Sequence, residues 1–189
     1  MEMLKKRIVE QAKVLGPDIL KVDMFLNHMI DISLLKAIGE EFHRRFADEK
    51  INKILTVEAS GIAVACMTAI AFGVPVVFAK KEEHSNVGGL CYTSDIYSFT
   101  RNIKTTICVS SSYLCASDRV LILDDFLANG SALTGLIDIA RQAGSTLVGA
   151  GIVIEKGFQG GGNALRESGV RIESLAYIES MDDGIIVFG

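Results

Sequence analysis

The sequence has no long apolar run, no secretory leader pattern and no low-complexity tract. Its most apolar stretch, residues 61–73, is shorter than the roughly 20 residues that a helix needs to cross a bilayer. The N-terminal segment, residues 1–16, spaces its apolar residues like an amphipathic helix and lacks the apolar core of a secretory signal. These absences predict a protein that neither spans a membrane nor is exported, and we expect it in the cytoplasm.

Positive charge is also scarce. The net charge is −4, and the basic residues occur only in pairs or triplets. A nucleic-acid-binding domain usually carries a clustered basic surface, so the composition argues against DNA or RNA as a partner. An anionic ligand would have to be held by local backbone amides and a few lysines rather than by a field from the whole protein.

Cysteine, histidine and glycine motifs of the common kinds are missing. The spacing of the four cysteines matches neither a redox pair nor a zinc cluster, and we expect reduced, mostly buried thiols. The three histidines show no metal-ligand spacing. Neither the GxxxxGK[ST] loop nor the GxGxxG dinucleotide motif is present, which excludes the two best-known nucleotide-binding loops.

Short runs rich in β-branched residues alternate with helical patterns along most of the chain. The length of 189 residues favours one domain, covering residues 1–189. Near-continuous apolar strands between helices indicate an α/β fold with a mostly parallel, doubly wound sheet. Strands are predicted at 53–57, 75–79, 105–110, 119–125, 146–155 and 170–178, and helices at 1–16, 61–73, 131–144 and 163–169. A further helix follows Asp31, a predicted N-cap.

Two stretches fit neither pattern. Residues 81–102 are long and polar enough for a mobile hairpin or lid. Residues 157–163 contain three consecutive glycines, which predict a flexible turn before Asn163 caps a short helix. Phe158, in this turn, is either a core aromatic or a stacking partner for a flat ligand.

Chemically active residues gather at predicted strand ends. In an open parallel sheet the ligand crevice lies beyond the carboxyl ends of the strands. Four such ends carry the sequences EASG at 58–61, AKK at 79–81, DDFLANGSA at 124–132 and EKGFQ at 155–159. We therefore expect these segments to meet at one edge of the sheet.

The segment 124–132 predicts a site for a sugar phosphate. Small residues between a strand and a helix leave the first-turn amides open to an oxyanion, and Gly130 permits a positive φ. At the last residues of a strand, Asp124 and Asp125 can both reach the crevice. Carboxylates repel a phosphate, so they are expected to face hydroxyl donors or Mg²⁺. A ribose 5-phosphate satisfies both requirements.

The stretch VLILDDFLANGSA, residues 120–132, resembles the signature of the type I phosphoribosyltransferases. The segments LKVDMFLNHMID, LTVEASGIA, IYSFT and VIEKGFQ extend the resemblance over nearly the whole chain. It is strongest to the purine enzymes, above all to the bacterial branch that uses xanthine. The resemblance implies the fold of that family, with a small hood built from about residues 1–32 plus C-terminal segments, and a homodimer.

The resemblance also implies a reaction and its residues. Xanthine and 5-phosphoribosyl 1-diphosphate would be converted, with Mg²⁺, to xanthosine 5′-monophosphate and diphosphate. The 5-phosphate would lie on Ala128, Asn129, Gly130, Ser131 and Ala132. The ribose hydroxyls or their metal would lie on Asp124 and Asp125. The diphosphate would face Glu58, Ala59, Ser60, Gly61, Lys80 and Lys81, the lysines in some relatives coming from the neighbouring subunit. The base would contact Leu20, Asn27 and Lys156, under a lid at residues 92–100.

The chain departs from part of the family at Ala128. Hypoxanthine-guanine enzymes carry a third acid there, which serves proton transfer at the base. The base proton would instead leave through Glu58, through water, or before an already ionised base binds. Lys156 argues against adenine, because an ammonium would meet its 6-amino group donor to donor.

Other interpretations remain open for these residues. The two aspartates would also suit a solvated turn that caps the next helix, and Lys156 would suit an exposed ion pair with Glu155. At the level of function, the alternatives are the same reaction with guanine or hypoxanthine, or a regulator that keeps the fold to sense phosphoribosyl diphosphate.

Overall fold

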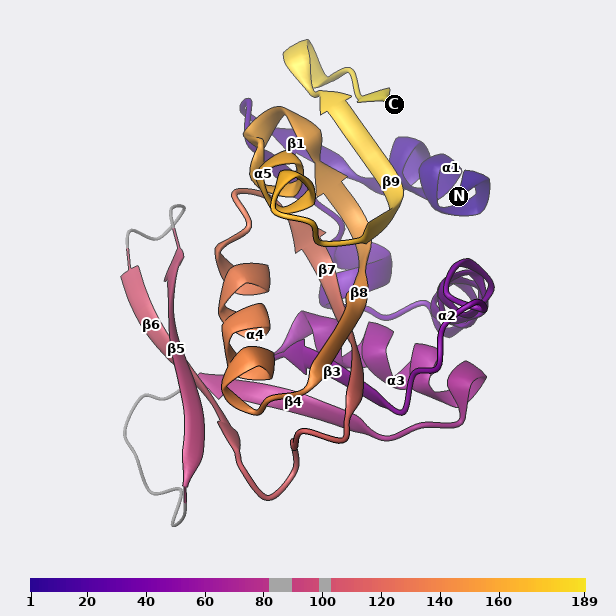
Figure 1. Cartoon of the computed structure of the whole chain (residues 1–189). Coiled ribbons are helices and arrows are strands. Elements are labelled where there is room, and N and C mark those ends of the chain that lie inside the picture. The colour runs from indigo at the N-terminus through magenta and orange to yellow at the C-terminus, as the bar shows by residue number, and fades with distance from the viewer. Residues whose placement is uncertain (82–89, 99–102) are drawn as a thin grey trace.

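A computed structural model describes residues 1–81, 90–98 and 103–189. Within these ranges the chain forms one eight-stranded sheet and a separate two-stranded hairpin (Figure 1). The strands of the large sheet, in spatial order, are β10 (Val187–Phe188), β9 (Ile172–Ser180), β8 (Thr146–Lys156), β7 (Arg119–Leu127), β3 (Lys53–Val57), β4 (Val76–Lys81), β6 (Ile103–Ser110) and β5 (Cys91–Ser98).

The middle of this sheet is parallel, as expected. Strands β9, β8, β7, β3 and β4 run side by side in the same direction. The flanking strands β10, β6 and β5 are antiparallel to their neighbours. The predicted mostly parallel α/β sheet is therefore confirmed, with antiparallel additions at both edges.

Helices cover both faces of the sheet, which makes it doubly wound. On one face, α1 (Glu2–Gln11), α2 (Ile32–Arg45) and α3 (Ser60–Phe72) share a buried apolar cluster with Leu121 and Leu123 of β7. On the other face, α4 (Ser131–Gln142) packs with Val120 and Ile122 of the same strand. Alternate residues of β7 thus face different layers, as strand geometry requires.

The start of α2 agrees with the sequence prediction. The Asp31 carboxylate accepts hydrogen bonds from the Leu34 amide at 3.1 Å and the Ser33 hydroxyl at 2.6 Å, and it pairs with Arg7 of α1 at 2.8 Å. Asp31 therefore caps α2 and also ties it to the first helix.

The prediction for residues 1–16 is wrong in its second half. Helix α1 ends at Gln11, and strands β1 (Lys13–Leu15) and β2 (Ile19–Lys21) form an antiparallel hairpin, followed by a π-helical turn, η1 (Asp23–Asn27). The apolar spacing of residues 13–16 suits either structure. Cross-strand pairing decides it, with Val14 opposite Leu20.

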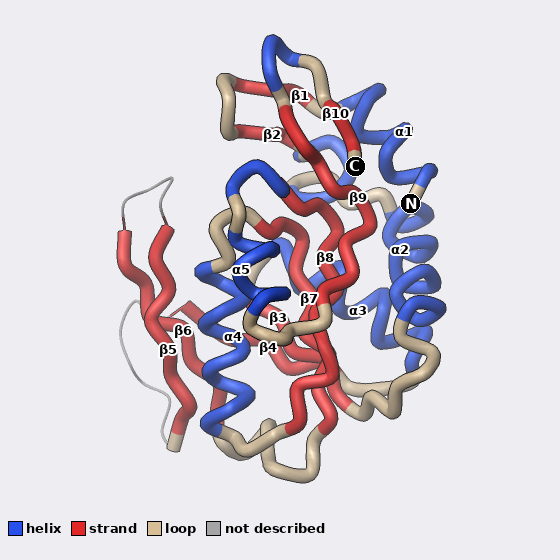
Figure 2. The backbone as a smooth tube through the Cα atoms, turned by 45° about the horizontal axis from the view of Figure 1, so that its top comes forward, coloured by secondary structure: helices blue, strands red, loops and turns tan. Residues whose placement is uncertain are grey.

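This hairpin lies close to the C-terminus of the chain. Figure 2 shows β1, β2 and β10 gathered at one end of the molecule. The N-terminal ammonium of Met1 bonds to the Leu175 carbonyl of β9 at 2.5 Å, and Lys5 reaches the Gly189 carbonyl at 3.2 Å. The two ends of the chain are thus held together beside the sheet.

The segment predicted as a hairpin or lid is a hairpin where it is described. Strand β5 pairs with β6 over its whole length and lies along α4. Gln142 of α4 bonds to both backbone groups of Thr93, and the Ser131 hydroxyl accepts from the Tyr97 amide at 2.7 Å. Residues 82–89 and 99–102 of the predicted lid lie outside the described residues.

Two smaller expectations need correction. Helix α5 (Gly161–Glu167) begins two residues before Asn163, with Gly160 at its N-cap, and follows a 3₁₀ turn, η2 (Gly157–Gln159). Asn163 therefore lies within the helix and does not cap it. Cys66 and Cys115 are exposed, whereas all four thiols were expected to be mostly buried. No helix in the described ranges is long and apolar enough to cross a membrane.

The crossing of α2 and α3 depends on Gly39. A Cβ atom at this position would lie 2.7 Å from the Met67 carbonyl oxygen and 2.9 Å from the Thr68 nitrogen, both backbone atoms of α3. Helix propensity alone predicts that Gly39→Ala stabilises by about 1 kcal/mol. We expect the clash to prevail, with a net loss of about 1–3 kcal/mol in unfolding free energy, measured by urea denaturation.

Lys36→Ala is the matched control, because Lys36 lies on the exposed side of the same helix. Its unfolding free energy should change by less than about 0.5 kcal/mol. A Gly39→Ala protein as stable as the wild type would contradict the role given to this close helix crossing.

Candidate active site

The carboxyl ends of the parallel strands meet at one edge of the sheet, as the sequence analysis expected. Strand β3 leads into the turn 58–61, β7 into the loop 128–132, and β8 ends at Lys156. The hairpin of β1 and β2 reaches the same edge, because Asp18 and Leu20 line a cavity with Lys156. The site is therefore built from both ends of the chain.

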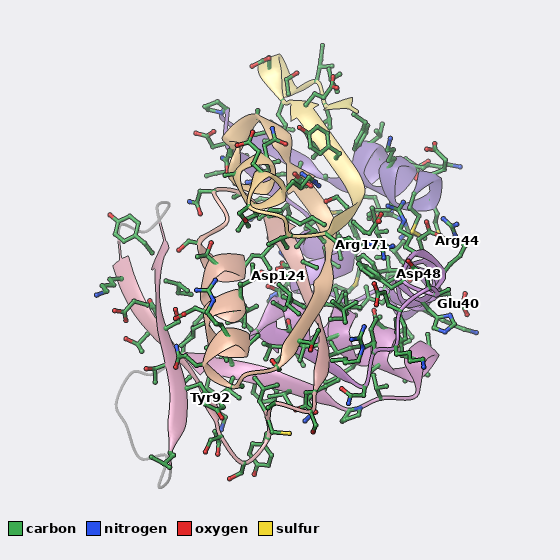
Figure 3. All side chains as sticks on the ribbon, viewed as in Figure 1. Glu40, Arg44, Asp48, Tyr92, Asp124 and Arg171 are labelled. Carbon is green, nitrogen blue, oxygen red and sulfur yellow. The ribbon has the colours of Figure 1, made fainter. Side chains whose placement is uncertain are left out.

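Asp124 and Asp125 are buried, with 6% and 7% of their surfaces exposed. They lie inside β7, which continues to Leu127, and not at its end as predicted. The interpretation as a solvated turn is therefore wrong. Figure 3 shows Asp124 in the centre of the molecule. The Asp125 amide donates to the Asp124 carboxylate at 3.0 Å.

The two carboxyl groups interact strongly. Burial raises the pKa of Asp124 well above its ordinary value, and the charge of Asp125 and a hydrogen bond between the two side chains raise it further. The positive charge of Lys81 acts in the opposite direction. A buried pair of like charges is costly without a cation or hydroxyl donors. This carboxylate pair therefore favours a ligand that supplies one or the other.

The turn at residues 58–61 lies directly against this carboxylate pair. Gly61 is in the first turn of α3, and a Cβ atom there would lie 3.1 Å from the Asp124 carboxylate and 2.2 Å from the Thr56 hydroxyl. Only glycine fits so close an approach. The Glu58–Ala59 peptide bond is cis, and the Glu58 carboxylate accepts from the Lys81 amide at 2.6 Å.

The two lysines of β4 serve different surfaces, because neighbouring residues of a strand point to opposite sides. The charge of Lys81 lowers the pKa of Asp124. Lys80 lines a separate groove of about 290 Å³ on β4 and β6. Of the predicted pair, Lys81 is the lysine whose charge acts on Asp124, and Lys80 lines the separate groove.

The loop at residues 128–132 has the form expected of an anion cradle. Gly130 has a φ of 85° and precedes the first turn of α4. The Asn129 side chain accepts from the Ser131 amide at 3.1 Å, and the Thr134 amide bonds to the Gly130 carbonyl at 2.9 Å. The other first-turn amides have no acceptor within the helix and face outward with a partial positive charge.

A cavity of about 650 Å³ adjoins this loop. It contains the predicted residues Leu20 and Lys156. Asn27, the third residue predicted to contact a base, is exposed and does not line it. The lining residues are Asp18, Ile19, Leu20, Phe126, Ala128, Asn129, Lys156 and Gln159.

Lys156 is half-buried at the end of β8. Its ammonium donates to the Asp18 carbonyl at 2.6 Å and lies 5.4 Å from the centre of the Phe126 ring. Burial lowers the pKa of Lys156, and Asp18 partly opposes this. The predicted ion pair with Glu155 is absent in this described region, because Glu155 points into the interior and pairs with Arg166.

Phe126, Asp18 and Gln159 also line this cavity and were not among the residues predicted from the sequence. Strand alternation offered a signal for Phe126, which lies two residues before Ala128 and so shares its side of the chain. Phe158, for which the sequence left a stacking role open, is 39% exposed and does not line the cavity. Asp18 and Gln159 come from turns, and no pattern in the sequence indicated that they would meet.

Comparison with known proteins identifies this architecture. The model of the phosphoribosyl transferase domain matches residues 21–162. The chain belongs to the phosphoribosyltransferase family. It is 57% identical over 188 residues to the xanthine phosphoribosyltransferase of Heliobacterium modesticaldum, covering 100% of both chains. It is 55% identical to that of Clostridium novyi, covering 100% of this chain and 99% of the relative.

Solved structures agree on the phosphoribosyltransferase fold. The adenine phosphoribosyltransferase from Giardia lamblia, in complex with 9-deazaadenine, superposes with a TM-score of 0.79 at 20% identity, covering 92% of this chain and 97% of that chain. The enzyme from Rhodothermus marinus gives 0.77 at 20% identity, with coverages of 94% and 100%. At this identity the likeness concerns the fold alone.

Asp124→Asn should stabilise the ligand-free protein at alkaline pH. Because the pKa of Asp124 is raised in the folded state, the folded protein binds more protons than the unfolded chain between the ordinary and the raised pKa. Stability therefore falls as the pH rises through that window. Asparagine removes this loss and keeps the acceptor for the Asp125 amide. We expect a higher Tm of the ligand-free variant at about pH 8, by about 2–4 °C for each kcal/mol recovered.

Calorimetry at about pH 8 and about pH 4 checks this prediction, since the gain should shrink at the lower pH. Asp118→Asn is the control with the opposite sign. Burial acts to raise the pKa of Asp118, but the hydrogen bonds that it accepts from Lys53 and Cys115 outweigh this and lower the pKa. Loss of the Asp118 charge should therefore reduce the Tm at neutral pH. A drop in Tm for Asp124→Asn would contradict this electrostatic interpretation.

Proposed function

We propose that this protein transfers the 5-phosphoribosyl group from 5-phosphoribosyl 1-diphosphate to xanthine, in purine salvage. One observation carries the proposal: the anion cradle at 128–132, the buried pair Asp124 and Asp125, and a cavity containing Lys156 and Phe126 all adjoin one another along β7 and β8. Full-length relatives that are 50–57% identical bear the name xanthine phosphoribosyltransferase, which supports the choice of base.

In this proposal each group of residues binds one part of the substrates. The amides of residues 128–132 hold the 5-phosphate, and Asp124 and Asp125 face the ribose hydroxyls. The turn 58–61 and Lys81 face the diphosphate. Displacement at C1 develops positive charge on the ribose and negative charge on the leaving group, so carboxylates on one side and amides with an ammonium on the other stabilise the transition state.

The buried acids also fit a magnesium ion carried by the diphosphate. Burial raises the pKa of Asp124 and the charge of Asp125 raises it further, and a nearby cation would oppose both effects. The described ranges contain no group of three or more His, Cys, Asp or Glu side chains that could by themselves hold a metal ion. Substrate and water oxygens would therefore complete the coordination, as is usual for Mg²⁺. When bound, the ion would neutralise charge on the leaving diphosphate.

The base would lie in the cavity between Leu20 and Phe126. Phe126 and Lys156 both line the cavity, and the Lys156 ammonium would pair with the purine 6-oxo oxygen. An ammonium there favours an oxopurine, and an ionised one in particular, over adenine. Such a base brings no proton that a third acid at position 128 would have to remove. We propose that the hood, residues 1–32 with the C-terminal segments, covers this cavity.

We further propose a cytoplasmic homodimer. The groove on β4 and β6 is lined mostly by apolar side chains, and two of them, Phe78 and Tyr113, are 39% and 64% exposed. Lys80 lines the same groove. A second copy packed there would cover apolar surface and leave Lys80 at the boundary between the copies, where the resemblance expects a basic residue shared with the neighbouring subunit.

A panel of purine bases tests the proposal. Diphosphate release is followed with phosphoribosyl diphosphate, Mg²⁺ and each base in turn. We expect kcat/KM for xanthine to exceed that for guanine and hypoxanthine by about 10-fold or more. Turnover with adenine alone would refute the assigned substrate. If no base is used, a regulator that senses phosphoribosyl diphosphate becomes the better interpretation.

Lys156→Met tests recognition of the base separately. A hydrogen bond to a charged group is worth about 1.5–3 kcal/mol, so KM for xanthine should rise about 10- to 150-fold, while KM for phosphoribosyl diphosphate changes little. Lys21→Met is the control, because Lys21 lies in the β1–β2 hairpin beside the cavity but does not line it. Its ammonium pairs with Asp23 and its side chain is 48% exposed. An unchanged KM for xanthine in the Lys156 variant would exclude this contact.

A further inference from the structure

A second buried carboxylate lies beside the site but outside the groups that contact the substrates. Glu155 is 1% exposed and directly precedes Lys156 on β8. Both of its oxygens accept from Arg166 of α5, at 2.7 and 2.6 Å, and the Ser174 hydroxyl of β9 also donates to it. This two-pronged pair joins two strands and a helix, and the hydrogen bond and charge of Glu155 raise the pKa of Arg166.

The first turn of α5 is enclosed between Glu155 and the loop at residues 128–132, the proposed phosphate loop. A Cβ atom on Gly162 would lie 1.9 Å from a Glu155 carboxylate oxygen. A Cβ atom on Gly161 would lie 2.2 Å from the Asn129 carbonyl carbon and 2.5 Å from the Ala128 oxygen. The Gly161 amide also donates to the Ala128 carbonyl at 3.2 Å. The backbone of two adjacent glycines therefore packs against Glu155 on one side and against the loop on the other, so a shift of Glu155 would displace the loop.

Stability is a weak reason for such a pair. Removing two charges from water costs about as much as their attraction returns, so a buried ion pair often adds little net free energy. What a two-pronged arginine contact does supply is fixed geometry. Here the groups held in place are Lys156, which follows Glu155 directly, and the loop that contains Asn129 and Gly130.

We propose that Glu155 and Arg166 are positioning residues that set the separation between the phosphate loop and Lys156. This inference rests on the proposed function of those two elements. Phosphoribosyl transfer needs the ribose and the base held at reacting distance, and small displacements are costly because the catalysis is positional. Loss of the pair should weaken binding of the 5-phosphate and of the base together.

The test compares Glu155→Gln with two other variants. Glutamine keeps the size and one acceptor but loses the charge and the two-pronged contact. At a temperature well below its Tm, we expect KM for both substrates to rise about 10-fold and kcat to fall. Arg166→Lys, which keeps the charge without the fork, should show a similar defect with less loss of Tm. Lys156→Met should affect the base alone.

Asp118→Asn is the matched structural control. Its partner Lys53 is 2.7 Å away, the two side chains are 7% and 16% exposed, and the pair lies at the opposite end of β7. This variant should lose Tm with kcat/KM unchanged. If Glu155→Gln behaves like Asp118→Asn, with a lower Tm and wild-type kinetic constants, Glu155 is merely structural and the proposal is wrong.

A binding measurement keeps this inference distinct from the proposed function. Calorimetric titration with phosphoribosyl diphosphate and Mg²⁺ does not require turnover. If the wild type uses no base, the proposed function fails, yet a roughly 10-fold weaker affinity of Glu155→Gln and Arg166→Lys for this ligand would still support positioning of the loop. Affinities equal to that of the wild type in both variants would overturn it.

Discussion

Two carboxylates buried side by side on β7 are the constraint on which this structure depends. Asp124 and Asp125 are almost inaccessible to solvent, and the first turn of α3 approaches so closely that only glycine fits at position 61. Like charges in such a place destabilise the ligand-free fold, and the apolar clusters on both faces of the sheet must offset that cost. In the proposed function, ribose hydroxyls and a cation would relieve the same repulsion, so the cost in stability would provide electrostatic preorganisation.

A single strand organises most of the chemistry. Along β7 and its continuation, the acids, the ring of Phe126 and the small residues of the loop at 128–132 follow one another within nine residues, 124–132. Strand β8 adds Lys156 beside them, and the N-terminal hairpin closes the far side of the cavity with Leu20. Because these groups sit on neighbouring parallel strands, their separation is set by the sheet. The pair of Glu155 and Arg166 then attaches α5 to the same frame.

Much of the fold followed from periodicity. The strand at 53–57 was predicted to the residue, because short β-branched runs bounded by turn residues are a strong signal. The other predicted strands overlap the observed ones but differ by one or two residues at one or both ends. The hairpin at 13–21 was missed, since three-residue strands leave no periodicity to distinguish them from a helix end. The end of β7 was placed too early for a related reason. Charged residues are normally a sign of a strand end, and here they continue the ladder with β8.

By itself, the sequence determined what is local in the chain: the central strands, the cap at Asp31, and the contiguous signature at 120–132 that carries the family resemblance. Only the tertiary structure decided which residues meet. Lys156 donates to the carbonyl of Asp18, 138 positions away in the sequence, and Glu155 pairs with Arg166 and not with the adjacent Lys156. The reason is physical, since a side chain's partner depends on burial and on the path of the whole backbone, and neither is written in the spacing of nearby residues.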